Sequence, residues 1–143
     1  MFPKISRRKK LIKVLLFIWQ LPQNIIGFII SRFCKSCAKN DIKFYYGNLF
    51  NAGISLGNFI IFDKRNITQP DFERSFKHEK GHQIQSKYLG WLYLVVVGIP
   101  SIVRNIYDRI AHKKWSYSKR KEWYYNGFPE KWADKLGGNI RKI

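Results

Sequence analysis

The stretch Ser75-Phe-Lys-His-Glu-Lys-Gly-His-Gln-Ile-Gln85 contains the pattern H-E-x-x-H, formed by His78, Glu79 and His82. Side chains four residues apart on a helix lie on one face, so both imidazoles can reach a single metal ion. Glu79, between them, is placed to act on a water held by that metal. The pattern therefore predicts a helix that carries a metal site. The alternative is a basic helix on which both histidines are solvated and Glu79 pairs with a lysine.

Glu130 is the candidate third ligand for this metal. Catalytic zinc takes three protein ligands and leaves one position for water. Glu130 begins the stretch Glu130-Lys-Trp-Ala-Asp134, where the preceding Pro129 is typical of a helix start. Glu130 and Asp134 share one face of that helix, so a ligand carboxylate and a carboxylate that orients a zinc-bound histidine are presented together. The alternative is an exposed helix on which both acids balance neighbouring lysines.

Together, these two patterns resemble the signature of a known enzyme family, the gluzincin metallopeptidases. The form Glu130-Lys-Trp-Ala-Asp134 resembles the E-x-x-A-D of the membrane-bound endopeptidases related to the CAAX prenyl protease. The resemblance implies that His78, His82 and Glu130 bind zinc, that Glu79 is the general base, and that Asp134 orients a ligand histidine. The chain is shorter than that family and does not show its several full membrane spans. Stretches downstream of the first motif also resemble a group of small uncharacterised bacterial membrane proteins, which implies no activity.

The residues before the first motif predict a small sheet, which makes the expected fold class α+β. Residues 42–46, 53–56 and 58–62 are rich in aromatic and β-branched side chains and are bounded by glycine and asparagine. This pattern favours an antiparallel sheet of two or three strands. Thr68 is a candidate cap for the following helix, and Pro70 suits its first turn.

Residues 1–40 are predicted to be a basic tail followed by a membrane-associated segment. Within them, residues 14–30 form a run of seventeen residues without a charge, with basic residues on both sides. At about 1.5 Å per residue, this run is slightly shorter than a typical hydrocarbon core. Gln20 and Gln23 interrupt it, although polar groups in lipid are costly. A kinked span and a helical hairpin in one leaflet both fit, and the alternative is a buried core helix of a soluble protein.

Residues 88–103 form a second uncharged run, which is broken by a glycine and a proline. If this run crossed a bilayer once, His78 and Glu130 would lie on opposite sides and could not share a metal. We therefore predict a re-entrant or packed segment that returns the chain to the same side. Residues 101–111 are expected to form an amphipathic helix with its apolar side toward the core. Residues 41–143, including this run, are predicted to form one small zincin-like metallopeptidase domain with a C-terminal helix.

The composition narrows the class of partner. The chain has 27 Lys+Arg against 9 Asp+Glu, a net charge of +18, and its 45% hydrophobic content excludes an intrinsically disordered protein. Cys34 and Cys37 are too few for a disulfide scaffold, and their C-x-x-C lacks the second pair of ligands that a zinc site needs. Basic residues flank both apolar runs instead of forming one stripe, which favours an anionic membrane surface over nucleic acid. We place the protein at a membrane, with the active site at the cytoplasmic interface.

These features predict a membrane-associated, zinc-dependent metallopeptidase that acts on a peptide or protein substrate. Glu79 takes a proton from a water that Zn²⁺ activates, and the resulting hydroxide attacks a peptide carbonyl. His112, Tyr124 and Tyr125 are candidates for stabilising the oxyanion, although His112 beside two lysines is otherwise typical of a solvated residue. The alternatives are a non-catalytic basic membrane protein and, with less support, a nucleic-acid-binding protein that uses the basic, aromatic stretch 115–125. No nucleic-acid partner is expected.

Overall fold

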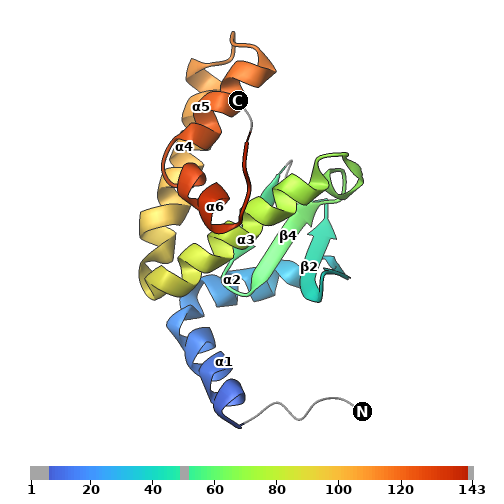
Figure 1. The fold of residues 1–143 in the computed structure, drawn as a ribbon, viewed down its shortest axis with the longest axis vertical. Coiled ribbons are helices and arrows are strands. Elements are labelled where there is room, and N and C mark those ends of the chain that lie inside the picture. The colour runs from blue at the N-terminus through green and yellow to red at the C-terminus, as the bar shows by residue number, and fades with distance from the viewer. Residues whose placement is uncertain (1–6, 49–51, 142–143) are drawn as a thin grey trace.

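The computed structural model describes residues 7–48 and 52–141, which form an α+β fold of six α-helices and one four-stranded sheet (Figure 1). The predicted α+β class is confirmed. In chain order, the elements are α1 (Arg7–Trp19), α2 (Leu21–Ser31), β1 (Lys35–Lys39), β2 (Ile42–Gly47), β3 (Gly53–Leu56), β4 (Phe59–Asp63), the short 3-10 helix η1 (Asn66–Thr68), α3 (Phe72–Leu89), the 3-10 turn η2 (Gly90–Leu92), the π-helical turn η3 (Leu94–Gly98), α4 (Ile99–Ala111), α5 (Tyr117–Asn126) and α6 (Glu130–Leu136).

The sheet is mixed, with the strand order β1-β2-β4-β3. β1 pairs with β2 and β3 pairs with β4 in antiparallel hairpins, whereas β2 and β4 run parallel, with Tyr45 opposite Ile61. The predicted sheet is antiparallel with two or three strands. This prediction is wrong for the central pair, β2 and β4, which is parallel, and for the number of strands, which is four. β4 turns back after β3 and lies between β3 and β2. It therefore runs antiparallel to β3 and parallel to β2.

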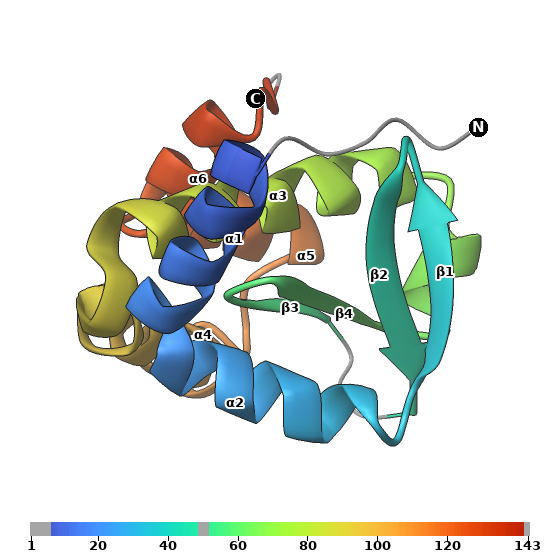
Figure 2. The same ribbon diagram turned by 90° about the horizontal axis from the view of Figure 1, so that it is seen from below.

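The hydrophobic core lies between the sheet and α3. Phe44, Ile60 and Phe62 from the strands pack against Phe76 of α3, and each is at most 4% exposed. Burying a side chain of this size stabilises a fold by about 1.5–3 kcal/mol. α2 covers the β3–β4 hairpin from the other side (Figure 2). The sheet thus holds α3, and with it the H-E-x-x-H motif, in a fixed position.

α3 confirms the helix predicted for this motif, but it begins later than predicted. Its first residue is Phe72, and Asp71 occupies the N-cap position. Thr68 ends η1 instead, and its hydroxyl donates a hydrogen bond to the carbonyl oxygen of Arg65. The predicted cap at Thr68 is therefore wrong.

The polar residues that interrupt the first apolar run lie at a 90° bend between α1 and α2. Gln23 Nε2 donates to Ser86 Oγ at 2.9 Å and to the carbonyl oxygen of Gly90 at 2.8 Å, and Ser86 Oγ donates to Gln20 Oε1. These contacts tie α2 to the end of α3. By contrast, α1 has no buried residue and projects from the body of the protein (Figure 1). Among the described residues, no single helix has the length and hydropathy to cross a bilayer; α1 and α2 meet that test only as a bent pair.

The second apolar run does not form one segment. Its residues form the end of α3, the segments η2 and η3, and the start of α4. Pro100 is tolerated because it lies in the first turn of α4. The expectation that α4 turns its apolar side to the core is wrong: Ser101, Asn105 and Asp108 face inward along a cleft. Its exposed apolar residues are Ile99, Ile102, Val103, Ile106, Tyr107 and Ile110.

Candidate metal centre

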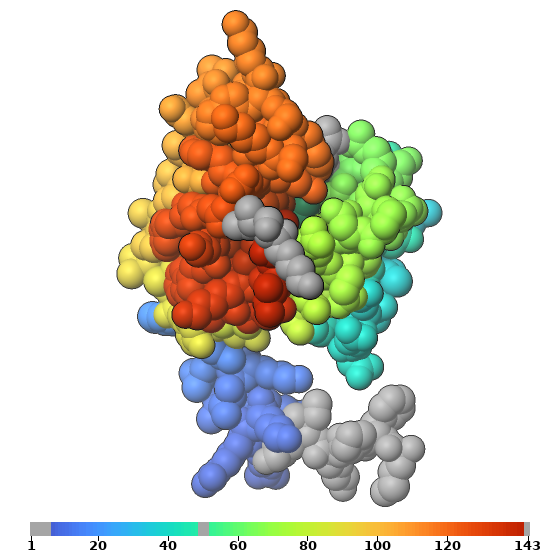
Figure 3. Space-filling view, turned by 45° about the horizontal axis from the view of Figure 1, so that its top comes forward, coloured from blue at the N-terminus to red at the C-terminus, as the bar shows by residue number. Residues whose placement is uncertain are grey.

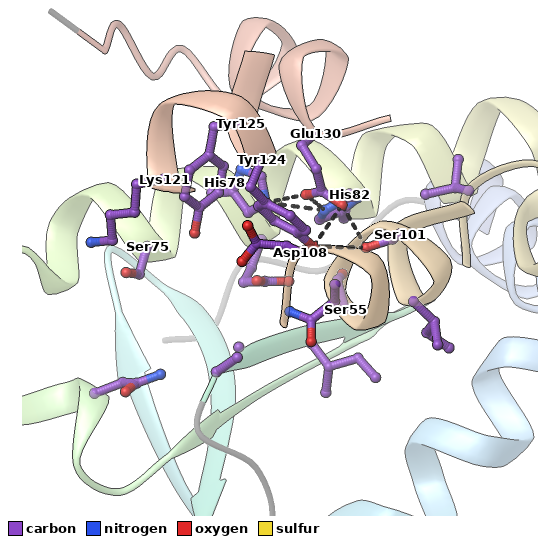
Figure 4. Close-up of a pocket in the computed structure, with 18 of the residues that line it drawn as sticks. Ser55, Ser75, His78, His82, Ser101, Asp108, Lys121, Tyr124, Tyr125 and Glu130 are labelled. Carbon is purple, nitrogen blue, oxygen red and sulfur yellow. Dashed lines mark hydrogen bonds and ion pairs between the residues drawn. The ribbon is translucent and has the colours of Figure 1, made fainter. Parts of the chain in front are cut away.

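The three predicted metal ligands converge on one point between α3 and α6. His78 and His82 extend from α3 and Glu130 from the first turn of α6 (Figure 4). Glu130 Oε2 lies 2.9 Å from His78 Nε2 and 3.2 Å from His82 Nε2, and the two Nε2 atoms are 3.1 Å apart. All three side chains are buried, and one ligand atom from each lies within 4.8 Å of the others. This group could hold a metal ion.

Glycine allows α3 and α6 to approach closely enough for this convergence. A Cβ atom on Gly81 would lie 1.8 Å from the carbonyl oxygen of Ala133, and one on Gly137 would lie 1.9 Å from the carbonyl oxygen of Lys77. Both clashes are with backbone atoms, which cannot rotate away as a flexible side chain can. Figure 3 shows α6 set directly against α3, between α3 and the α4–α5 hairpin.

Hydrogen bonds on the far side of each imidazole orient the two histidines. His78 Nδ1 lies 2.8 Å from Asp134 Oδ1, and an ionised carboxylate can only accept, so Nδ1 carries a proton. Gln85 Nε2 donates to the carbonyl oxygen of Pro129, which leaves Gln85 Oε1 to accept from His82 Nδ1 at 2.7 Å. Both Nε2 atoms are thereby directed at Glu130. This carboxylate or amide support of a ligand histidine is typical of metal sites.

Asp134 and Glu130 are themselves held in place by other side chains. Arg141 and Asn139 donate to the Asp134 carboxylate. Ser101 Oγ donates to Glu130 Oε1, and Tyr124 OH donates to the same oxygen at 3.0 Å. Glu130 therefore turns Oε1 toward two hydroxyl groups and keeps Oε2 for the histidines, as a ligand that binds through one oxygen requires.

The charge of the site favours a cation. Burial disfavours protonated His78, but hydrogen bonds to Asp134 and Glu130 outweigh burial and raise its pKa to about 9. Burial also opposes the ionised form of Glu130, yet hydrogen bonds from His78 and His82 hold its pKa well below the usual value. Glu79 and Glu130 are buried beside the two imidazoles, whereas Asp134 is already paired with Arg141. Buried negative charge requires a positive partner. A divalent cation would supply that charge, so the residues present fit a metal.

Glu79 is placed beside the ligands but is not paired with them. Its side chain is buried, and its Oε2 has no hydrogen-bond partner among the described residues. Burial raises the pKa of this carboxyl group above its usual value. A buried carboxylate oxygen without a partner is costly for folding, and a raised pKa is what a general base near neutral pH requires. These properties distinguish Glu79 from a surface glutamate that balances a lysine.

A cleft of about 880 Å³ is lined by the candidate ligands His78, His82 and Glu130. β3 and α3 line one side, and α4 and α5 line the other. The lining includes the apolar side chains of Val97 and Tyr93 and the basic side chains of Arg109 and Lys121. The volume is within the range of small-molecule and cofactor sites. Ser55, on the edge strand β3, faces the same cleft as the ligand histidines (Figure 4).

The three oxyanion candidates have different positions. Tyr124 and Tyr125 line the cleft, with the Tyr124 hydroxyl bonded to Glu130 and the Tyr125 ring packed edge-on against His78. His112 is buried between Trp115 and another indole and hydrogen-bonds to Asp108, outside the cleft lining. The expectation that His112 is a solvated surface residue is wrong.

Several residues that build the site carry no sequence signal of their own. Gly81 lies in a variable position of the motif, and Ser101 and Arg141 lie outside both motifs. Gln85 could have been recognised, because it lies three residues after His82 and therefore on the same helix face. No family model, curated protein or solved structure matches the chain, so its function has to be inferred from the geometry of this site.

Proposed function

We propose that this protein is a zinc-dependent metallopeptidase. The observation that carries the proposal is the convergence of two imidazoles and one carboxylate on a single point, beside a buried carboxylate with a free oxygen. Two histidines and one glutamate are a common ligand set for catalytic zinc. The resemblance of the two motifs to gluzincin metallopeptidases supports the same assignment of residues.

Each residue has a specific task in this reaction. His78, His82 and Glu130 would hold the zinc, and Asp134 and Gln85 keep the two Nε2 atoms directed at it. Bound zinc lowers the pKa of a water and polarises the carbonyl that the water attacks.

Glu79 accepts the proton from the attacking water and later returns it to the leaving amine. Its buried, unpartnered oxygen and its raised pKa fit this role. β3 is an edge strand that lines the cleft, and edge strands can pair with an extended peptide. Such a peptide would lie beside the Ser55 carbonyl oxygen, which accepts a hydrogen bond from the Tyr93 hydroxyl.

Metal content is the first test of this proposal. We expect purified protein to bind about one zinc per chain, and we expect His82→Ala and Glu130→Gln to abolish tight binding. Glu122→Gln, which changes an exposed glutamate on α5, is the matched control and should bind zinc like the wild type. Equal zinc content in all four proteins would contradict the proposed ligands.

Turnover of a quenched-fluorescence peptide library is the second test. Glu79→Gln should retain zinc but lose roughly a hundred- to ten-thousandfold in rate, the usual contribution of a general base. If the wild type binds zinc but cleaves no peptide and no membrane protein substrate, the alternative of a non-catalytic protein gains support. Unchanged turnover in Glu79→Gln would refute its role as the base.

A further inference from the structure

The distribution of side chains on α4 is inverted. This helix turns polar residues toward the protein, including Ser101, Asn105 and Asp108, and turns apolar residues outward. In water, an amphipathic helix buries the opposite side. The preceding residues 90–98 bury Tyr93 and Val97 but expose Trp91, Leu92 and Val95. We call the outward side the outer apolar side; it consists of Trp91, Leu92, Val95, Ile99, Val103, Ile106, Tyr107 and Ile110, each more than half exposed. Ile102 is also exposed but lines the cleft.

The polar interior explains why α4 cannot rotate its apolar side inward. Ser101 donates to the candidate ligand Glu130, and Asp108 pairs with Arg120 and His112. Arg104 donates to the backbone carbonyl oxygens of Trp123 and Tyr124. Rotation of the helix would break these contacts, so the outer apolar side stays exposed unless a membrane or another molecule covers it.

The outer apolar side is continuous with exposed apolar residues of α1 and α2. Trp91 Nε1 donates to the carbonyl oxygen of Ile18, and Trp19 Nε1 donates to that of Lys87. These two contacts join the end of α1 to η2 and to the last turn of α3. Beyond this junction, α2 exposes Ile25, Ile26, Phe28 and Ile29. The resulting surface exceeds the scattered apolar residues that are normal on a soluble monomer.

We propose that this surface lies in the headgroup region of an anionic lipid bilayer. Exposed basic residues stand at both ends of the η2–α4 segment: Lys87 precedes it, and Lys113 and Lys114 follow it. The indoles at the α1–η2 junction are side chains that prefer the boundary between hydrocarbon and water. Apolar side chains flanked by lysine and arginine are typical of helices that lie in a membrane interface.

Charge also argues against a second copy of this chain as the partner. Each copy carries a net charge of +18, and like charges on two copies repel. An anionic bilayer instead attracts this charge and accepts the apolar residues in the same contact. The proposal is independent of the metal centre, because no residue of the outer apolar side is a candidate ligand.

Vesicle binding tests the proposal. The full chain is mixed with vesicles of phosphatidylcholine alone or with phosphatidylglycerol added, and the bound fraction is measured by flotation. We expect binding to the anionic vesicles that weakens with salt. The double variant Ile106→Gln/Ile110→Gln should lower the partition coefficient by roughly a hundredfold, about tenfold for each isoleucine removed from the lipid contact.

Ile140→Gln is the matched control, because Ile140 is exposed but lies outside the outer apolar side. It should bind vesicles like the wild type. Glutamine is a good helix former, so the double variant should keep its circular dichroism spectrum and its zinc content. Since contributions from distant helices add in free energy, binding through α1 would not mask the loss.

Two results would overturn the proposal. One is a double variant, folded by these measures, that binds anionic vesicles as tightly as the wild type. The other is a wild type that ignores vesicles but forms an oligomer in analytical ultracentrifugation, which the same double variant dissociates. That outcome would assign the outer apolar side to a second copy of the chain.

Discussion

α3 and α4 are consecutive helices that both bury polar side chains but differ in what covers their other side. α3 buries two histidines, a glutamate, a glutamine and a serine, whereas α4 buries one aspartate and exposes its isoleucines. Both helices turn polar side chains toward the cleft, from its two sides. The comparison teaches that the cleft, and not hydropathy, decides which side of each helix faces inward. The difference between them is what covers the other side: the sheet and α6 cover α3, and α4 is left open.

The contact between α3 and α6 gives the largest expected effect. Gly81→Ala places a Cβ against the backbone of Ala133, so the two helices must separate. We expect a loss of about 3 kcal/mol or more in the free energy of unfolding, together with loss of zinc binding. Urea denaturation and metal analysis measure both.

Gly98→Ala, at the start of α4, is the matched control for this substitution. Its new Cβ would meet atoms no closer than 3.7 Å, an ordinary contact. Alanine is a better helix former than glycine, so we expect a gain of about 0.5–1 kcal/mol. A Gly81→Ala protein as stable as wild type would show that α3 and α6 do not touch through their backbones.

A smaller effect is expected from the support of the ligands. Asp134→Asn keeps the shape of the side chain but removes the charge that holds the proton on His78 Nδ1. Zinc affinity should fall roughly ten- to a hundredfold, as measured by competition with a chelating dye. Asp41→Asn, in the exposed turn between β1 and β2, should leave the affinity unchanged. Equal affinity in both variants would mean that Asp134 does not position the histidine.

The smallest effect is expected on the open side of α4. Val103→Gln replaces an exposed apolar residue on the outer apolar side. In the absence of vesicles, the free energy of unfolding should stay within about 0.5 kcal/mol of the wild-type value. A loss of more than about 1 kcal/mol would show that another part of the protein covers this side in solution, which would remove the contrast with α3.

Short-range patterns predict much of the site from the sequence. The spacing of His78, Glu79 and His82 fixes their relation on a helix, and the same holds for Glu130 and Asp134. The distance between the two helices is not encoded by such spacing. It depends on Gly81 and Gly137, whose lack of a side chain gives no pattern until the partner helix is known.

Other elements could not be predicted because their sequence patterns are weak or favour the wrong pairing or orientation. The strand β1 lacks aromatic and β-branched residues, and its pairing depends on positive φ values at Asn40 and Asp41, which suit a two-residue hairpin turn. β2 and β4 pair in parallel because β3, the strand between them in the chain, lies at the outer edge of the sheet instead of pairing with β2. For α4, periodicity correctly located the apolar side but assigned it to the interior, because periodicity alone does not show that the polar side of this helix lines a cleft.

The close approach of α3 and α6 also determines how much of this protein would have to be moved to build the same centre in another scaffold. A graft of His78, Glu79, His82, Glu130 and Asp134 alone would not be enough. Any side chain larger than that of glycine at positions 81 and 137 would hold the two helices apart. The transferable unit is a helix pair with glycine at 81 and 137, together with the residues that brace the ligands, including Gln85 and Arg141. A designer would also need counterparts of α4 and α5, because Ser101 on α4 and Tyr124 on α5 supply the two hydroxyl groups that donate to Glu130.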